Sequence, residues 1–86
     1  MDLLELRKQL DELDEQIVAL YERRMDISSQ VADYKIQTGK KVFDKEREIA
    51  KLHAVKELTH NEFTGRGIQE LFEQIISMSR KLQYQL

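Results

Sequence analysis

The sequence predicts an all-α protein of three helices, one long and two shorter. Apolar residues recur with a helical period through most of the 86 residues, the chain has no proline, and no segment shows the alternation of a strand. A chain of this length forms one core and buries only about 60% of the surface that its unfolded form exposes. We therefore expect a single domain over residues 1–86, for which association would add stability.

The first helix is expected to run from Leu3 to about Thr38, since neither proline nor glycine interrupts it. At about 1.5 Å per residue it would be roughly 54 Å long, whereas a compact globule of this size is about 30 Å across. Its apolar face is formed by Leu6, Leu10, Leu13, Ile17, Leu20, Ile27 and Val31. So long and broad a face needs partners outside its own domain, which predicts an obligate homodimer.

Two shorter helices are expected after a break. Gly39 is placed to end the first helix in a left-handed conformation, and Asp44 to cap a second helix over roughly residues 45–59. A polar break at residues 59–61 precedes a third helix that reaches almost to the C-terminus. Thr64 is its candidate N-cap, although Gly65 and a further glycine leave the start of this helix open.

The composition limits the classes of function. Fourteen Lys and Arg residues against sixteen Asp and Glu give a net charge of -2, which disfavours nucleic-acid binding. The absence of cysteine excludes disulfides and thiolate chemistry, and two histidines make a metal site unexpected. Without a long apolar run or a signal-peptide pattern, we expect a soluble cytoplasmic protein that does not bind membranes.

Cations interrupt the apolar face of the first helix. Arg24 and Lys35 are three helical turns apart, lie within about 20° of each other around the axis, and fall among the apolar residues of that face. A buried cation without a partner costs several kcal/mol, so each needs a protein carboxylate or an anionic ligand. Alternatively, both side chains extend to solvent at the edge of the face.

Polar residues also interrupt the other two helices. Ser79 and Gln83, one turn apart, place a hydroxyl and an amide on the apolar face of the third helix, where a core hydrogen bond is the alternative explanation. Asp44, Arg47 and Glu48 open the second helix. Taken alone, this trio is better explained by ordinary capping and solvated charge.

Arg7 precedes Arg24 by about 25 Å along the helix, too far for the two to share a small ligand within one chain. A partner helix that crosses the first helix would bring the start of one chain close to the middle of the other. Arg66, Arg80 and Lys81 are interpreted as surface charge.

Together, these residues resemble the all-helical chorismate mutases over essentially the whole chain. The order and spacing of the matching segments carry the resemblance, rather than any single segment. They are LRKQLDELDEQIVALYERR from Leu6 to Arg24, the lysine of VADYK at Lys35, VFDKERE from Val42 to Glu48, and IISMSRKLQ from Ile75 to Gln83. The resemblance implies an intertwined homodimer that rearranges chorismate, a dicarboxylate, to prephenate in phenylalanine and tyrosine biosynthesis. No cofactor, metal or covalent intermediate is implied.

The resemblance also implies roles for individual residues. Arg24, Arg47 and the partner subunit's Arg7 resemble the arginines that bind the substrate carboxylates, with Ser79 assisting. Lys35 and Gln83 resemble the pair that donates to the ether oxygen. Glu48 and the backbone of Asp44 resemble the groups that hold the ring hydroxyl. All eight positions carry the residue type of the family.

Two other functions remain open at this point. An isochorismate pyruvate lyase of the same fold would need a similar pocket for a diacid, although VFDKERE and the chain length favour the mutase. The chain could instead be a non-catalytic helical dimerisation or regulatory module, against which the intact pocket residues argue. The sequence also leaves open whether these residues form a complete enzyme or one module of a larger polypeptide.

Overall fold

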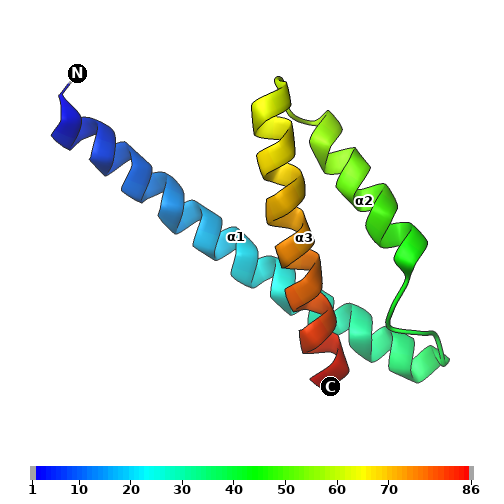
Figure 1. The fold of residues 1–86 in the computed structure, drawn as a ribbon. Coiled ribbons are helices and arrows are strands. Elements are labelled where there is room, and N and C mark those ends of the chain that lie inside the picture. The colour runs from blue at the N-terminus through cyan, green and yellow to red at the C-terminus, as the bar shows by residue number, and fades with distance from the viewer. Residues whose placement is uncertain (1, 86) are drawn as a thin grey trace.

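The computed structural model describes residues 2–85, which form three helices and no strand (Figure 1). Helix α1 spans Leu3–Thr38, α2 spans Lys45–Glu57 and α3 spans Glu62–Gln85. The all-α class and the bounds of the first helix are confirmed. The second helix ends two residues earlier than expected.

Helix α1 is closed at both ends by local hydrogen bonds. The Asp2 carboxylate accepts from the Glu5 amide at 2.8 Å, which satisfies one free donor of the first turn. At the other end Gly39 adopts φ 72°, and the Lys40 amide donates to the Lys35 carbonyl at 2.9 Å. This is the left-handed glycine cap that the sequence predicts.

The break between α2 and α3 is built from side chains that satisfy backbone groups. The Thr59 hydroxyl donates to the Lys56 carbonyl at 2.6 Å as α2 ends. The Asn61 side chain then accepts from the Thr64 amide at 2.8 Å. The expectation that Thr64 caps the third helix is therefore wrong. Asn61 lies three residues earlier and supplies the acceptor, so the helix has already begun when the chain reaches Thr64.

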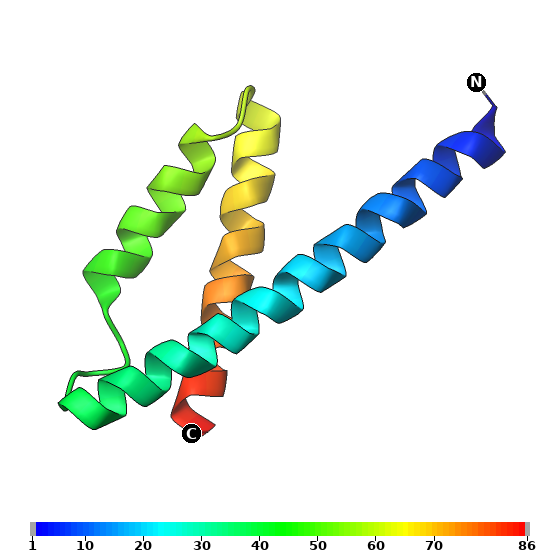
Figure 2. The ribbon, with the colours of Figure 1, turned by 180° about the vertical axis from the view of Figure 1, so that it is seen from behind.

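Helix α3 is the central element, because it packs against both α1 and α2, which do not pack against each other. Figures 1 and 2 show α3 crossing the C-terminal half of α1, with α2 beside its first half. Gly65 allows the close approach of α2 and α3. A Cβ atom there would lie 3.0 Å from the Thr59 hydroxyl and 3.2 Å from Cγ of Lys56.

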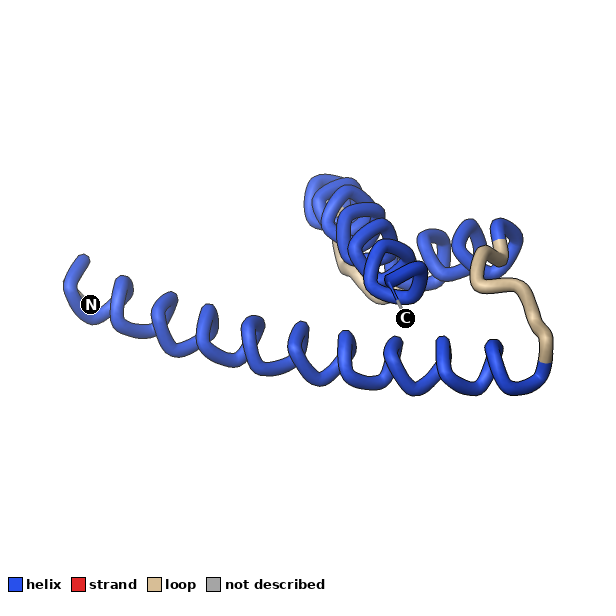
Figure 3. The backbone as a smooth tube through the Cα atoms, turned by 90° about the horizontal axis from the view of Figure 1, so that it is seen from below, coloured by secondary structure: helices blue, strands red, loops and turns tan. Residues whose placement is uncertain are grey.

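The N-terminal half of α1 extends away from the other two helices, as Figure 3 shows from below. The chain measures 55 × 25 × 15 Å, and its radius of gyration is 16.0 Å, against about 12 Å for a compact chain of this length. Among residues 2–85, no helix is both long enough and apolar enough to cross a membrane.

The apolar core of the single chain is small. Among residues 2–85, the buried apolar residues are Ala32, Val55 and Ile76, and no large side chain is fully buried. The apolar face of α1 is mostly exposed, with Ile17 at 58% and Leu20 at 64%. This face has no cover within the described chain, so the reason for expecting a homodimer stands, and the homodimer itself stays a prediction.

Alanine substitutions at Gly39 and at Gly67 should change the free energy of unfolding in opposite directions. Neither position has a neighbour within 4 Å of an added Cβ, so only the backbone conformation decides the result. Gly39→Ala should lower the free energy of unfolding by about 1 kcal/mol, because φ is positive there. Gly67→Ala, within α3, should raise it by about 0.5–1 kcal/mol. Urea unfolding at one protein concentration measures both, and a neutral Gly39→Ala would contradict the cap.

Candidate active site

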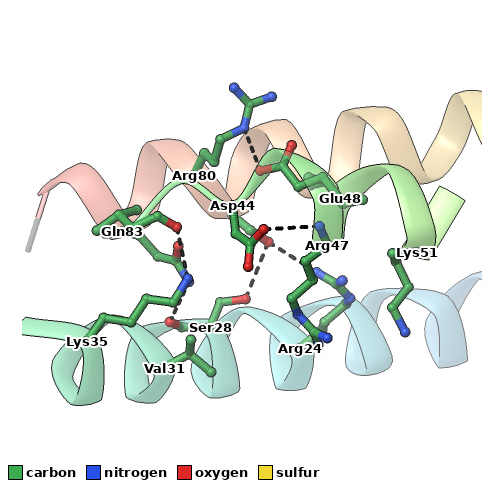
Figure 4. Close-up of a pocket in the computed structure, with 13 residues that line it drawn as sticks. Arg24, Ser28, Val31, Lys35, Asp44, Arg47, Glu48, Lys51, Arg80 and Gln83 are labelled. Carbon is green, nitrogen blue, oxygen red and sulfur yellow. Dashed lines mark hydrogen bonds and ion pairs between the residues drawn. The ribbon is translucent and has the colours of Figure 1, made fainter. Parts of the chain in front are cut away.

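A pocket lies where the C-terminal half of α1, the start of α2 and the last turns of α3 meet (Figure 4). It includes seven of the eight residues singled out in the sequence, and Arg7 is the exception. The lining residues are Arg24, Ser28, Val31, Lys35, Val42, Asp44, Arg47, Glu48, Lys51, Ile76, Ser79, Arg80 and Gln83. The fold therefore brings together groups that are up to about 60 positions apart in the sequence.

Buried hydroxyl groups hold Arg24 in place. Its Nη1 donates to Oγ of Ser79 at 3.1 Å, and the Ser28 hydroxyl donates to the same oxygen at 3.3 Å. Ser28 and Ser79 are only 9% and 8% exposed. The guanidinium also lies over the Phe72 ring, 5.8 Å from its centre. Arg24 keeps further N–H groups for a ligand, since a guanidinium has five.

Backbone carbonyls anchor the other two donors of the pocket. Nζ of Lys35 donates to the Val42 carbonyl at 2.9 Å, and Nε2 of Gln83 donates to the Ser28 carbonyl at 3.1 Å. An ammonium has three N–H groups and an amide has two. Each side chain is thus held at one N–H group and retains at least one more for a ligand.

The first turn of α2 supplies charged groups to the same pocket. The Asp44 carboxylate accepts from the Arg47 amide at 3.1 Å and so caps the helix. The Arg47 and Glu48 side chains follow directly, on the first turn. The N-terminal end of a helix carries a partial positive charge, which adds to the attraction of this region for anions.

The pocket is rich in cations that have no carboxylate partner. Five cationic side chains line it, against two carboxylates, those of Asp44 and Glu48. Glu48 is paired with Arg80, and Asp44 serves as the helix cap. Within residues 2–85, no ion pair to a carboxylate is formed by the other four cations, which are Arg24, Lys35, Arg47 and Lys51. Such a pocket suits a ligand with more than one negative charge.

These cations are not evenly distributed. Figure 4 shows Arg24, Arg47 and Lys51 toward one end of the pocket, and Lys35 with Gln83 toward the other. The arrangement can bind carboxylates at one end while neutral and charged N–H donors meet a different part of the ligand. Among residues 2–85, His, Asp and Glu side chains form no group of three that could hold a metal ion.

Arg80 is not the surface charge expected from the sequence. Its side chain is 39% exposed and lines the pocket, with Nε 3.1 Å from Oε2 of Glu48. Arg80 lies one turn before Gln83, so the helical period alone places the two on neighbouring parts of one face. That signal was available in the sequence. Ser28, one turn after Arg24, was missed although the same rule applies.

Other lining groups gave no comparable signal. The Val42 carbonyl is a main-chain atom, and any residue there would supply it. Lys51 follows Arg47 by one turn on a charged helix, where solvated lysines are common. Arg7 is exposed and lies on the projecting half of α1, remote from the pocket of its own chain. This agrees with the distance expected from the helical rise.

Residues 6–84 match the family described as chorismate mutase type II. The chain belongs to this family. It is 34% identical over 85 residues to a chorismate mutase of Methanocaldococcus jannaschii, a match that covers 96% of this chain and 85% of that protein. It is also 40% identical over 52 residues to the T-protein of Haemophilus influenzae. That match covers 60% of this chain but spans only 14% of the T-protein. The resemblance inferred from the sequence is confirmed.

Proposed function

We propose that this chain is a chorismate mutase, which rearranges chorismate to prephenate within this pocket. The observation that carries the proposal is the gathering of unpaired cations and anchored donors, of the residue types expected for this reaction, in a chain of the chorismate mutase type II family. The relative from Methanocaldococcus jannaschii, also named a chorismate mutase, is matched over most of its length.

The reaction makes particular demands on a catalyst. A [3,3] rearrangement transfers no proton to the protein and needs no nucleophile. The enzyme must instead hold the flexible diacid in a compact conformation and stabilise the charge that develops as the C–O bond breaks. In this proposal Arg24 and Arg47 bind the carboxylates, and Ser79 both fixes Arg24 and assists at a carboxylate.

Lys35 and Gln83 donate to the ether oxygen of the substrate. Both are fixed in advance by backbone carbonyls, so little reorganisation is needed when the oxygen gains negative charge. Their contacts are stronger in the transition state than in the ground state, and this difference is what lowers the barrier.

The ring hydroxyl is held at the start of α2. The Asp44 carbonyl already accepts from the Glu48 amide at 3.1 Å, which leaves the Asp44 N–H as the backbone group for the hydroxyl oxygen. The Glu48 carboxylate accepts a hydrogen bond from the ring hydroxyl. Asp44 therefore acts through its backbone, while its carboxylate caps the helix.

The working unit in this proposal is a cytoplasmic homodimer, one domain per chain, in which the partner subunit's Arg7 completes each pocket. The exposed apolar side chains of α1 support association, because Leu10, Leu13 and Ile17 are each more than half exposed in the single chain. Arg7 lies on this uncovered half of α1. A second chain that covers the N-terminal half of α1 would bring the second chain's pocket close to Arg7.

Lys35→Ala should lower kcat about 10²–10³-fold, the usual cost of losing one donor to a developing oxyanion. The measurement is the loss of chorismate ultraviolet absorbance, with prephenate identified as product. Lys81→Ala is the matched control, because Lys81 is exposed on α3 outside the pocket. Turnover by Lys35→Ala near that of the unaltered chain would contradict the role of Lys35. Release of pyruvate from isochorismate, with no prephenate formed from chorismate, would favour the lyase.

Gln83→Glu should move the pH optimum of turnover to lower pH. An amide donates at any ordinary pH, whereas a carboxyl group donates only when protonated, so activity of the variant should rise as the pH falls through the pKa of the new carboxyl group. Initial rates across a pH series measure the shift. Gln74→Glu, at an exposed position of the same helix, should keep the original profile. An unchanged profile for Gln83→Glu would argue against Gln83 as the donor.

Two inactive variants should restore activity when their chains are mixed. Arg7→Ala and Arg24→Ala should each be nearly inactive alone. If Arg7 serves the partner's pocket, a mixed dimer has one intact pocket and one that lacks both arginines. After refolding of an equal mixture, turnover should reach about a quarter of the original value, because half of the dimers are mixed and each has one working pocket of two. Activity no higher than the mean of the two variants would contradict a shared pocket.

A further inference from the structure

Arg80 contacts residues on both sides of Asp44, at the edge of the pocket. Its Nε lies 3.1 Å from Oε2 of Glu48, on the first turn of α2. Its guanidinium also lies over the Phe43 ring, 5.1 Å from the ring centre, in the segment just before α2. Arg80 itself belongs to the turn of α3 that carries Ser79. The Arg80 side chain thereby connects the last part of α3 to the first turn of α2 and to the segment that precedes it.

The contact between Arg80 and Glu48 is ionic rather than a well-formed hydrogen bond. The Nε atom is buried, and no acceptor within residues 2–85 meets hydrogen-bond geometry with it. Within residues 2–85, the Glu48 carboxylate accepts no hydrogen bond, although the Glu48 side chain is only 20% exposed. The carboxylate is therefore held in position by a charge while its acceptor capacity stays available.

Ordinary surface ion pairs contribute little to stability, and Arg66 with Glu62 on the same helix is such a pair. Nε of Arg66 lies 3.3 Å from Oε1 of Glu62, and both side chains are mostly exposed. The hydrogen bond from Arg66, together with the charge of Lys56, lowers the pKa of the Glu62 carboxyl. The pair of Arg80 differs, because its carboxylate faces the pocket and its guanidinium is confined by Phe43.

We propose that Arg80 is a positioning residue. It holds the Glu48 carboxylate where the carboxylate accepts a hydrogen bond from the ring hydroxyl of the substrate. The inference rests on the proposed function, and within it on the role given to Glu48. Without the charge of Arg80, Glu48 can turn toward one of the unpaired cations of the pocket, Arg47 among them. That movement would remove the acceptor of the hydroxyl and also occupy a group that binds a substrate carboxylate.

The test is a double-mutant cycle between the two residues. Arg80→Met keeps most of the aliphatic stem and removes the charge. It should lower kcat/KM by about 10- to 100-fold, because displacing a substrate-positioning group by as much as about 1 Å can cost a factor of about 100. In a Glu48→Gln background, which has no charge for Arg80 to hold, Arg80→Met should change kcat/KM by less than about twofold. Arg80→Lys should restore part of the loss.

Arg66→Met is the matched control, since it removes an exposed arginine–glutamate ion pair from the same helix, outside the pocket. It should leave kcat/KM unchanged. Circular dichroism during thermal unfolding follows the fold of each variant. If Arg80→Met does not fold, Arg80→Lys replaces it in the cycle, with a smaller loss that should again vanish beside Glu48→Gln.

Three outcomes would overturn the inference. If the kcat/KM of Arg80→Met equals that of Arg66→Met, the charge of Arg80 does not position Glu48. Equal losses in both backgrounds would show that Arg80 acts independently of Glu48. If the unaltered chain does not turn over chorismate, the proposed function and this inference fail together, whereas either of the first two results beside normal turnover of the unaltered chain overturns the inference alone.

Discussion

The contact between α1 and α3 is the interaction on which the rest of the structure depends, and several side-chain hydrogen bonds cross it. Ser79 accepts from both Arg24 and Ser28, and Gln83 donates to the Ser28 carbonyl. Few apolar side chains are buried in the single chain. The hydrogen bonds that join the two helices are therefore made by the groups that line the pocket. A change in this interface alters the packing of the fold and the geometry of the site together.

The unbalanced charge of the pocket has a cost in the absence of a ligand. Several cations lie close to one another and to the positive end of α2, and a protein built for stability alone would pair them with carboxylates. The chain instead commits its two carboxylates of the pocket to capping α2 and to pairing with Arg80. The five cations and two carboxylates leave three excess positive charges. A dianionic substrate would offset two of them, so binding would also reduce the repulsion between the cations.

Helical period and capping chemistry predicted the bounds of α1 and the Gly39 and Asp44 caps, and the period singled out Arg24, Lys35, Ser79 and Gln83. These features depend on local spacing, which a sequence displays directly. The resemblance to the chorismate mutases was needed to assign Asp44, Arg47 and Glu48 to the same site. The Thr64 cap was wrong because Asn61, which lies closer to the break, accepts from the Thr64 amide and starts the helix three residues earlier. Arg80 was wrongly assigned to the surface, although its spacing from Gln83 placed both on one face of the third helix. Its pairing with Glu48 could not be predicted, because the distance between two helices cannot be obtained from the period of either one. The use of backbone carbonyls as anchors could not be seen either, since every residue has one.

The anchoring of Lys35 by the Val42 carbonyl determines which sequence changes the loop between α1 and α2 can tolerate. The acceptor belongs to the main chain, so any amino acid at position 42, proline included, would preserve it as long as the loop keeps its path. The identity of that side chain is then free to follow other needs, such as contact with the substrate or with neighbouring apolar groups. What must be inherited is the length and course of the segment between α1 and α2, and an insertion or deletion there would do more harm than a substitution.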